Sequence, residues 1–244
     1  GRIDEVEERL HISSMKGHTG ICHTRWATHG VPCMDNAHPL LDCTRRIALV
    51  HNGIIENFME LKPWLEAEGH VFNSRTDTEV IVHLVEKALK VHPGSPLDAT
   101  ANALRQVSGS YAIAILFADY PDRIILARQE SPLIVGLGDE GMYCASDITA
   151  ILPVAQDMIV LEEGDIAELT ADRITVKSIS TGHEGEREVQ KITFSLDAAE
   201  KGGYPHFMLK EIFEQPQTLR DGLKIAQRYI AHVVSILDEA DSIV

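Results

Sequence analysis

The chain has 244 residues, of which 44% are hydrophobic and 24% are charged, and its formal net charge is −15. These values are ordinary for one large globular domain, or for one domain and part of a second. A strongly negative chain is repelled by phosphate backbones and by anionic lipid headgroups, so the charge argues against a nucleic-acid or membrane-surface partner. The longest apolar runs, such as residues 111–118, are far shorter than the ~20 residues that span a bilayer.

Four cysteines and twelve histidines are the remaining compositional features. The cysteines form no CxxC pair, and no basic segment followed by an apolar one opens the sequence. We therefore expect reduced thiols in a cytoplasmic protein. The sequence has no HExxH motif and no closely spaced Cys/His cluster, so it predicts no metal site and no cofactor.

The first half of the chain is predicted to be mostly helical. A short amphipathic helix and a loop occupy residues 1–16, and a buried strand at 46–50 leads into Asn52-Gly53, a dipeptide typical of turns. Apolar residues at helical spacing predict further helices at about 58–68, 80–89 and 97–107.

The start of the second of these helices carries its own signal. Thr76-Asp77-Thr78-Glu79 fits a capping box, in which a Ser or Thr and a Glu three residues later satisfy the free N–H groups of a helix start. In the helix that follows, the apolar residues of 80–89 predict a single apolar stripe.

The second half is predicted to be β-rich. Seven short strands separated by turn residues are expected, at 111–118, 124–127, 133–137, 142–145, 158–161, 166–169 and 174–176. Residues 181–191 read as a loop. From His206 the pattern is helical again, interrupted at Pro216, with a long amphipathic helix at 223–237 and the start of a strand at 242–244. Together these elements predict an α+β fold with one domain at 1–203 and a connector to a second domain at 204–244.

Three motifs concentrate chemically useful side chains: HTRWATHG at 23–30 with NAHP at 36–39, HNGIIEN at 51–57, and TDTEV at 76–80. Arg25 offers a planar fork suited to a carboxylate. Asp77, in the first turn of a predicted helix, suits an ammonium group. Asn52 supplies a side-chain amide and Gly53 an unobstructed backbone N–H, the two kinds of donor that an oxyanion hole needs.

Each of these residues also has an ordinary structural interpretation. A lone Arg is usually a solvated surface charge, and an Asp at a helix start is usually a cap. Asn-Gly after a strand is more often a hairpin turn. Trp26 fits a core position as well as an apolar cover over a ligand. His29 and the histidine of NAHP are expected to order loops through hydrogen bonds and not to act as catalytic bases.

The motifs together favour function, because in this order they resemble the glutaminase domain of the glucosamine-6-phosphate synthase family. SGSYAIAIL, SPLIVGLG, ASDITAIL, EEGDIAEL and HFMLKEIFEQP, later in the chain, resemble the same family. The resemblance implies an N-terminal nucleophile hydrolase fold, a four-layer αββα sandwich. It also implies that an N-terminal Cys attacks the side-chain amide of glutamine while its own α-amine serves as the base.

The resemblance assigns roles position by position. Arg25 would bind the carboxylate of L-glutamine and Asp77 its ammonium group, while Asn52 and Gly53 would form the oxyanion hole. Around them, Thr28 and His29 would line the site, with Trp26 on a mobile loop that covers it.

The resemblance also implies partners beyond this chain. A further domain would bind fructose 6-phosphate, take up the ammonia and form glucosamine 6-phosphate, in an enzyme expected to be a homodimer without a cofactor. Roughly fifty residues, including the nucleophilic Cys, would precede Gly1. None of the four cysteines matches that nucleophile, so the chain alone is expected to be inactive.

Two other functions fit the same residues. The chain is compatible with a non-catalytic glutamine-binding module. It is also compatible with the glutaminase domain of another class II amidotransferase, such as amidophosphoribosyltransferase, which shares the Arg and Asn-Gly features.

Overall fold

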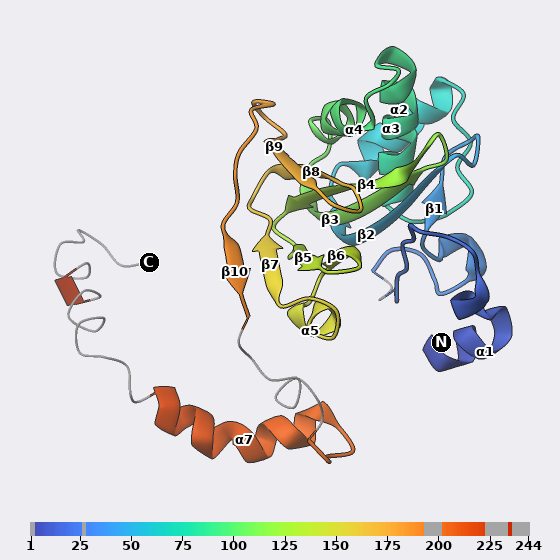
Figure 1. Ribbon diagram of the computed structural model, residues 1–244. Helices are drawn as coiled ribbons and strands as arrows, with labels where there is room; N and C mark the ends of the chain where they lie inside the picture. The colour runs from blue at the N-terminus through green and yellow to red at the C-terminus, as the bar shows by residue number, and fades with distance from the viewer. Residues whose placement is uncertain (1–2, 26–27, 193–201, 223–233, 236–244) are drawn as a thin grey trace. The chain divides into compact units, whose positions relative to one another are not determined.

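A computed structural model of the chain describes residues 3–25, 28–192, 202–222 and 234–235 (Figure 1). The chain divides into two units, residues 1–193 and 194–244, which we treat separately. The domain boundary that the sequence predicts, after residue 203, stays a prediction.

Two antiparallel sheets form the centre of the first unit (Figure 1). The larger sheet has six strands, in the order β1 (Leu40–Leu41), β2 (Ile47–Ile55), β3 (Gly109–Phe117), β4 (Tyr120–Gln129), β8 (Asp165–Leu169) and β9 (Ile174–Ser178). The smaller sheet has four, in the order β10 (Val189–Lys191), β7 (Asp157–Val160), β5 (Ile134–Gly138) and β6 (Gly141–Ala145). All seven strands predicted between residues 111 and 176 are confirmed.

The helices of the described residues are α1 (Ile3–Leu10), α2 (Phe58–Ala67), α3 (Glu79–Val91), α4 (Pro96–Leu104), the single turn α5 (Ile148–Ile151) and, in the second unit, α7 (Phe207–Gly222). Short 3₁₀ turns lie at Ile12–Ser14 and Met34–Asn36. The helices predicted near 1–16, 58–68, 80–89 and 97–107 are therefore confirmed. No helix in this described part is both long and apolar enough to cross a membrane.

Both faces of the larger sheet are buried. Since successive side chains of a strand point to opposite faces, Leu49 and Ile113 pack with helices α3 and α4 in one core. Their neighbours Val50 and Ala112 pack in a second core with Val135 and other residues of the smaller sheet. Burial on both faces explains why β2 and β3 are almost continuously apolar.

A short helix covers the outer face of the smaller sheet. At Gly136 on β5 an added Cβ would lie only 2.3 Å from Ile151 of α5 and 3.1 Å from Ala155. The absence of a side chain at Gly136 thus permits α5 and the following turn to lie directly on the strand. The layers are helix, sheet, sheet and helix, which confirms the α+β class and the αββα sandwich.

The prediction of a turn at Asn52-Gly53 is wrong. Strand β2 runs through both residues, which pair with Ala112 and Tyr111 of β3. Gly53 has φ of +132°, and a Cβ there would lie 2.1 Å from the carbonyl oxygen of Ser110. The glycine therefore serves the close approach of two strands, one of the established reasons for glycine within a strand.

The capping box predicted at 76–79 is also wrong. The predicted box needs Thr76 as the N-cap, with Glu79 inside the helix three residues later. Helix α3 instead begins at Glu79, and its N-cap is Thr78, whose side chain makes no capping hydrogen bond. The hydroxyl of Thr78 bonds Nδ1 of His51, and the carboxylate of Glu79 accepts from the backbone N–H groups of Asn73 and Ser74. Tertiary partners on β2 and in the preceding loop therefore replace the local cap.

Several other predictions concern α3, the segment 181–191 and the C-terminal part of the chain. The apolar residues predicted to form a stripe on α3 pack in one core, and the polar residues among the first eight of this helix are buried as well. Strand β10 lies within the predicted loop at 181–191, and α7 continues through Pro216. Most of the predicted helix at 223–237 and the predicted strand at 242–244 lie outside the described residues.

Replacing Gly53 by Ala should destabilise the fold through a steric clash. We expect Gly53→Ala to lower the free energy of unfolding by about 3 kcal/mol, because overpacking adds ~1–3 kcal/mol to the strain of a positive φ. Gly69→Ala is the control, since Gly69 also has positive φ (+93°) but no atom within 4 Å of its added Cβ. Urea unfolding of both variants measures the difference, and equal losses would contradict a clash at Gly53.

Candidate functional site

A cavity of about 340 Å³ opens beside β2 and the start of α3. Its volume is within the range of small-molecule sites. Thirteen residues line it: His23, Thr24, Arg25, Thr28, His38, His51, Asn52, Gly53, Ile54, Thr76, Asp77, Thr78 and Ser110. Five of the seven residues singled out from the sequence are among them. Of the other two, His29 reaches Asp77 without being part of this lining, and Trp26 lies outside the described residues.

Asp77 provides a buried negative charge to this cavity, with only 3% of its surface exposed. One carboxylate oxygen, Oδ2, accepts a hydrogen bond of 2.7 Å from the backbone N–H of Ile55. The other, Oδ1, lies 3.7 Å from Nδ1 of His29. Strand β2 thus orients the carboxylate through Oδ2, and Oδ1 is the oxygen that would contact a cationic ligand.

Arg25 provides the positive charge. Its Nη2 donates to the carbonyl oxygens of His29 and Gly30, the latter at 3.1 Å. These contacts tie the guanidinium group of Arg25 to the backbone of His29 and Gly30. Thr28 also lines the cavity.

His23 orients the side chain of Asn52. Its Nε2 lies 2.8 Å from Oδ1 of Asn52. An amide oxygen can only accept, so His23 donates this hydrogen bond and the Asn52 NH₂ group stays available as a donor. That is the orientation a donor to an oxyanion requires. His23 belongs to the first motif, but nothing in the sequence signals its contact with a residue 29 positions later.

Burial keeps two histidines of the lining uncharged. Burial is the largest cause that lowers the pKa of His38 to about 3, and electrostatic interactions with His23, His51 and Arg25 add to it. Burial also lowers the pKa of His51, whose Nδ1 pairs with Thr78. His38 Nδ1 accepts from the backbone N–H of His51 at 3.4 Å, a loop-ordering contact of the kind expected from the sequence.

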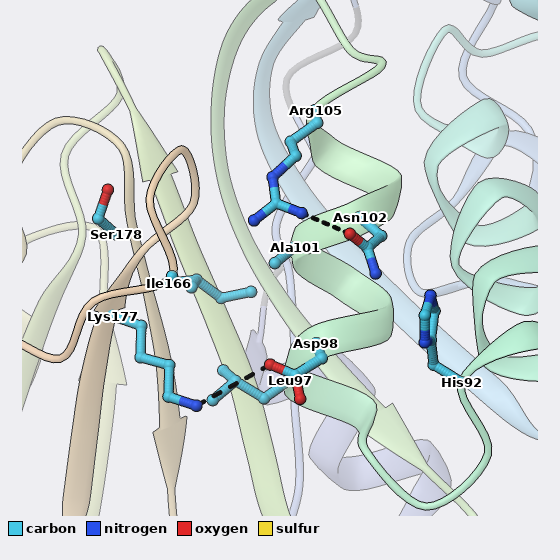
Figure 2. Close-up of a pocket in the computed structure, with 10 residues that line it drawn as sticks. His92, Leu97, Asp98, Ala101, Asn102, Arg105, Ile166, Lys177 and Ser178 are labelled. Carbon is cyan, nitrogen blue, oxygen red and sulfur yellow. Dashed lines mark hydrogen bonds and ion pairs between the residues drawn. The ribbon is translucent and has the colours of Figure 1, made fainter.

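A second cavity, of about 310 Å³, lies between α4 and strands β8 and β9. Figure 2 shows Arg105 directed toward the amide oxygen of Asn102, and Lys177 toward the carboxylate of Asp98. Arg105 also donates from Nε to the carbonyl oxygen of Ile179 at 2.8 Å. These charges hold α4 against the sheet, and no residue predicted to be functional lines this cavity.

The family model of the glutamine amidotransferase domain matches residues 23–153, more than half of the 244 residues. The chain belongs to the glutamine amidotransferase family. The matched segment contains all seven predicted site residues and both sides of the cavity that they share. Membership of this family makes glutamine the substrate of the domain.

Curated relatives match all or most of this chain. The chain is 49% identical over 244 residues to a protein of Thermococcus kodakarensis and 52% identical over 225 residues to one of Methanothermobacter thermautotrophicus. Both are named glutamine–fructose-6-phosphate aminotransferase (isomerizing). The alignments include 100% and 91% of this chain, but only 40% and 37% of those relatives. The chain thus spans about two fifths of their length.

Solved structures place the fold in the same group. Glutamine phosphoribosylpyrophosphate amidotransferase from B. subtilis is 26% identical, with a TM-score of 0.54 over 65% of this chain and 34% of its own. A structure described as the allosteric regulatory enzyme of purine biosynthesis has a TM-score of 0.51 at 26% identity, over 60% of this chain and 32% of its own. The fold is that of the N-terminal nucleophile amidotransferases, as the resemblance implied.

Because the folded chain holds His38 in its neutral form, the free energy of unfolding should depend on pH. The pKa of His38 is about 3 in the folded chain and near 6.5 when unfolded, so between these values the unfolded state binds more protons. The free energy of unfolding should therefore fall as the pH drops below about 6.5. From pH 7 to pH 5 we expect His38 to account for a loss on the order of 1–2 kcal/mol.

Urea unfolding at the two pH values measures this loss. His38→Gln should show a correspondingly smaller difference between them. Replacement of the exposed His92 by Gln is the matched control and should leave the difference unchanged. An equal pH dependence in the wild type and His38→Gln would contradict neutral burial of His38.

Proposed function

We propose that this chain is the glutamine-hydrolysing part of an enzyme that makes glucosamine 6-phosphate from fructose 6-phosphate and glutamine. The observation that carries the proposal is the shared cavity. Arg25 and Asp77, of opposite charge, line it together with the donors Asn52 and Gly53. A zwitterionic amino acid with a reactive side-chain amide needs this combination of groups.

Binding of glutamine uses the two charges. The guanidinium group of Arg25 presents N–H donors in a planar fork, which matches an α-carboxylate. Asp77, buried and already oriented by Ile55, offers a carboxylate oxygen to the α-ammonium group. Thr28 lines the same cavity, and His29 holds the far side of Asp77. We assign Trp26 to the cover over the bound ligand.

Hydrolysis begins when a thiolate attacks the side-chain amide carbon. The carbonyl oxygen becomes an oxyanion, which the NH₂ group of Asn52 and the backbone N–H of Gly53 stabilise. Ammonia leaves, and water then releases glutamate from the thioester. Among the residues that the structure describes, no cysteine lines the cavity. We therefore assign the nucleophile to an N-terminal Cys preceding Gly1 in the longer protein, with its own α-amine as the base.

The second half of the reaction belongs to the rest of that protein. The curated relatives are more than twice as long as this chain. We place the site for fructose 6-phosphate in the remaining length, which the residues from 204 onward would connect to the glutaminase. A cytoplasmic homodimer without a cofactor is part of the same proposal.

One alternative acceptor has specific support. The B. subtilis structure named above is an amidotransferase of phosphoribosylpyrophosphate, and it shares this fold. The identity of 26% to that enzyme is lower than the 49–52% to the two fructose-6-phosphate aminotransferases. The higher identity to the fructose-6-phosphate aminotransferases favours fructose 6-phosphate over phosphoribosylpyrophosphate as the acceptor.

The choice of acceptor is tested on the longer protein with an N-terminal Cys. Incubated with glutamine and fructose 6-phosphate, it should form glucosamine 6-phosphate and glutamate in equal amounts, detected by mass spectrometry. With phosphoribosylpyrophosphate as acceptor no aminated sugar should form. Phosphoribosylamine as the product would establish the alternative enzyme, and glutamine binding without any product would indicate a non-catalytic module.

Substitutions in the cavity should separate binding from chemistry in the same protein. Arg25→Ala should raise KM for glutamine roughly 10–100-fold, since it removes a charge-assisted hydrogen bond worth ~1.5–3 kcal/mol. Asn52→Ala should lower kcat on the order of 10²–10³-fold with a smaller effect on KM, as expected for an oxyanion donor.

Arg173→Ala is the control for the first substitution, because Arg173 is exposed and lies outside the cavity. Its KM and kcat should equal those of the wild type. Similar effects of Arg25→Ala and Arg173→Ala would contradict the role of Arg25. A raised KM with unchanged kcat in Asn52→Ala would make Asn52 a binding residue.

A further inference from the structure

Four potential metal ligands from three segments of the chain lie close together, and none of them lines the glutamine cavity. Cys43 lies in the turn between β1 and β2, His70 follows α2, and His83 and Glu86 lie one turn apart on α3. Their ligand atoms all lie within 4.8 Å of one another. The four residues are spread over 44 positions of the chain, so their sequence spacing does not reveal the cluster.

Four of the six distances between the ligand atoms lie close to those of tetrahedral coordination, and all six are within 4.8 Å. Sγ of Cys43 is 3.7 Å from Nδ1 of His70 and 3.6 Å from Nδ1 of His83. Oε2 of Glu86 is 3.0 Å and 3.4 Å from the same two nitrogens. Around one zinc ion, bond lengths of ~2.3 Å to sulfur and ~2.0–2.1 Å to nitrogen and oxygen put sulfur about 3.6 Å and oxygen about 3.3 Å from each nitrogen.

We propose that Cys43, His70, His83 and Glu86 bind a zinc ion. A thiolate, two imidazoles and a carboxylate form a donor set that zinc accepts in tetrahedral geometry. Four protein ligands leave no open position for water or substrate, so the site is structural and takes no part in the reaction. Cys43 is exposed while the other three ligands are buried, which gives the ion a route to the site from solvent.

The surroundings of the four ligands resemble the outer shell of a metal site. Metal-bound histidines usually direct their second nitrogen at a carboxylate or carbonyl oxygen. His83 is 0% exposed, and its Nε2 lies 3.7 Å from Oε1 of Glu79 without a hydrogen bond among the described residues. The backbone N–H of Val71 donates to Sγ of Cys43 at 3.3 Å, and Lys90 donates to the other oxygen of Glu86 at 2.9 Å.

Zinc binds a thiolate, neutral imidazole nitrogens and a carboxylate, so its binding releases protons from these groups. In this structure His70 and His83 contact Oε2 of Glu86 at hydrogen-bond distance, and a zinc ion would replace these two contacts.

The site would stabilise a segment that matters for glutamine binding. Glu79, next to His83, holds the backbone N–H groups of Asn73 and Ser74 at 2.7 Å each. This loop leads directly into Asp77. An ion that joins the β1–β2 turn, the end of α2 and α3 would therefore hold the start of α3 in place.

Metal analysis of the purified protein tests the proposal. Prepared with zinc in the growth medium and then desalted, the protein should carry about one zinc per chain by inductively coupled plasma mass spectrometry. Cys43→Ser and His83→Gln should lower this to a small fraction of one zinc. Cys33→Ser, at an exposed cysteine outside the cluster, is the control and should keep the full amount.

A second measurement starts from the wild-type protein. Apo wild-type protein should bind one equivalent of Zn²⁺ in competition with a chromophoric chelator, and its melting temperature should rise with the metal. Replacement by Co²⁺ should produce a thiolate-to-cobalt charge-transfer band, which is absent in Cys43→Ser. No stoichiometric zinc in the wild type, or the same zinc content and cobalt spectrum in Cys43→Ser, would overturn the proposal and leave a hydrogen-bonded network without metal.

Discussion

Two hydrogen bonds between β2 and the entry to α3 hold the glutamine cavity together. His51 pairs with the hydroxyl of Thr78 at 2.8 Å, and the N–H of Ile55 donates to Asp77 at 2.7 Å. Both are buried, where leaving a polar group unpaired costs ~1–3 kcal/mol. Between the two strand residues lie Asn52 and Gly53. The same two hydrogen bonds therefore fix the position of the proposed oxyanion donors, Asn52 and Gly53, relative to the proposed ammonium-binding carboxylate of Asp77.

Burial of helix α3 explains why its polar residues contact other polar groups inside the protein. The first eight residues of α3 are buried, so the polar side chains among them cannot hydrogen-bond to water and need hydrogen-bond partners inside the protein. Glu79 satisfies the loop before Asp77, while His83 and Glu86 converge with residues from two other segments. Burial of α3 thus connects the loop that shapes the glutamine cavity to the proposed zinc ligands.

Sequence patterns predicted the strands because both sheets alternate or repeat apolar residues, which is a local signal. They failed where distant partners decide the structure. Asn52-Gly53 has the sequence of a turn, but pairing with β3 makes it part of a strand. Residues 76–79 have the sequence of a capping box, but Thr78 bonds His51 and Glu79 bonds the preceding loop instead. The cavity residues were recognisable through long motifs of a family. The four-residue cluster around Cys43 was not, since its members are separated by 27, 13 and 3 positions and meet only in the fold.

The contacts of Arg25 link ligand binding to the loop that contains it. A guanidinium group presents two forks to a carboxylate, one from Nε and Nη2 and one from Nη1 and Nη2, so both forks require Nη2. In this structure Nη2 donates to the carbonyl oxygens of His29 and Gly30. A carboxylate bound through either fork must therefore share or replace one of these contacts. Binding of glutamine in the proposed manner thus changes the hydrogen bonds between Arg25 and the backbone of His29 and Gly30. Trp26, which the family resemblance places on a loop over the site, directly follows Arg25 in the chain.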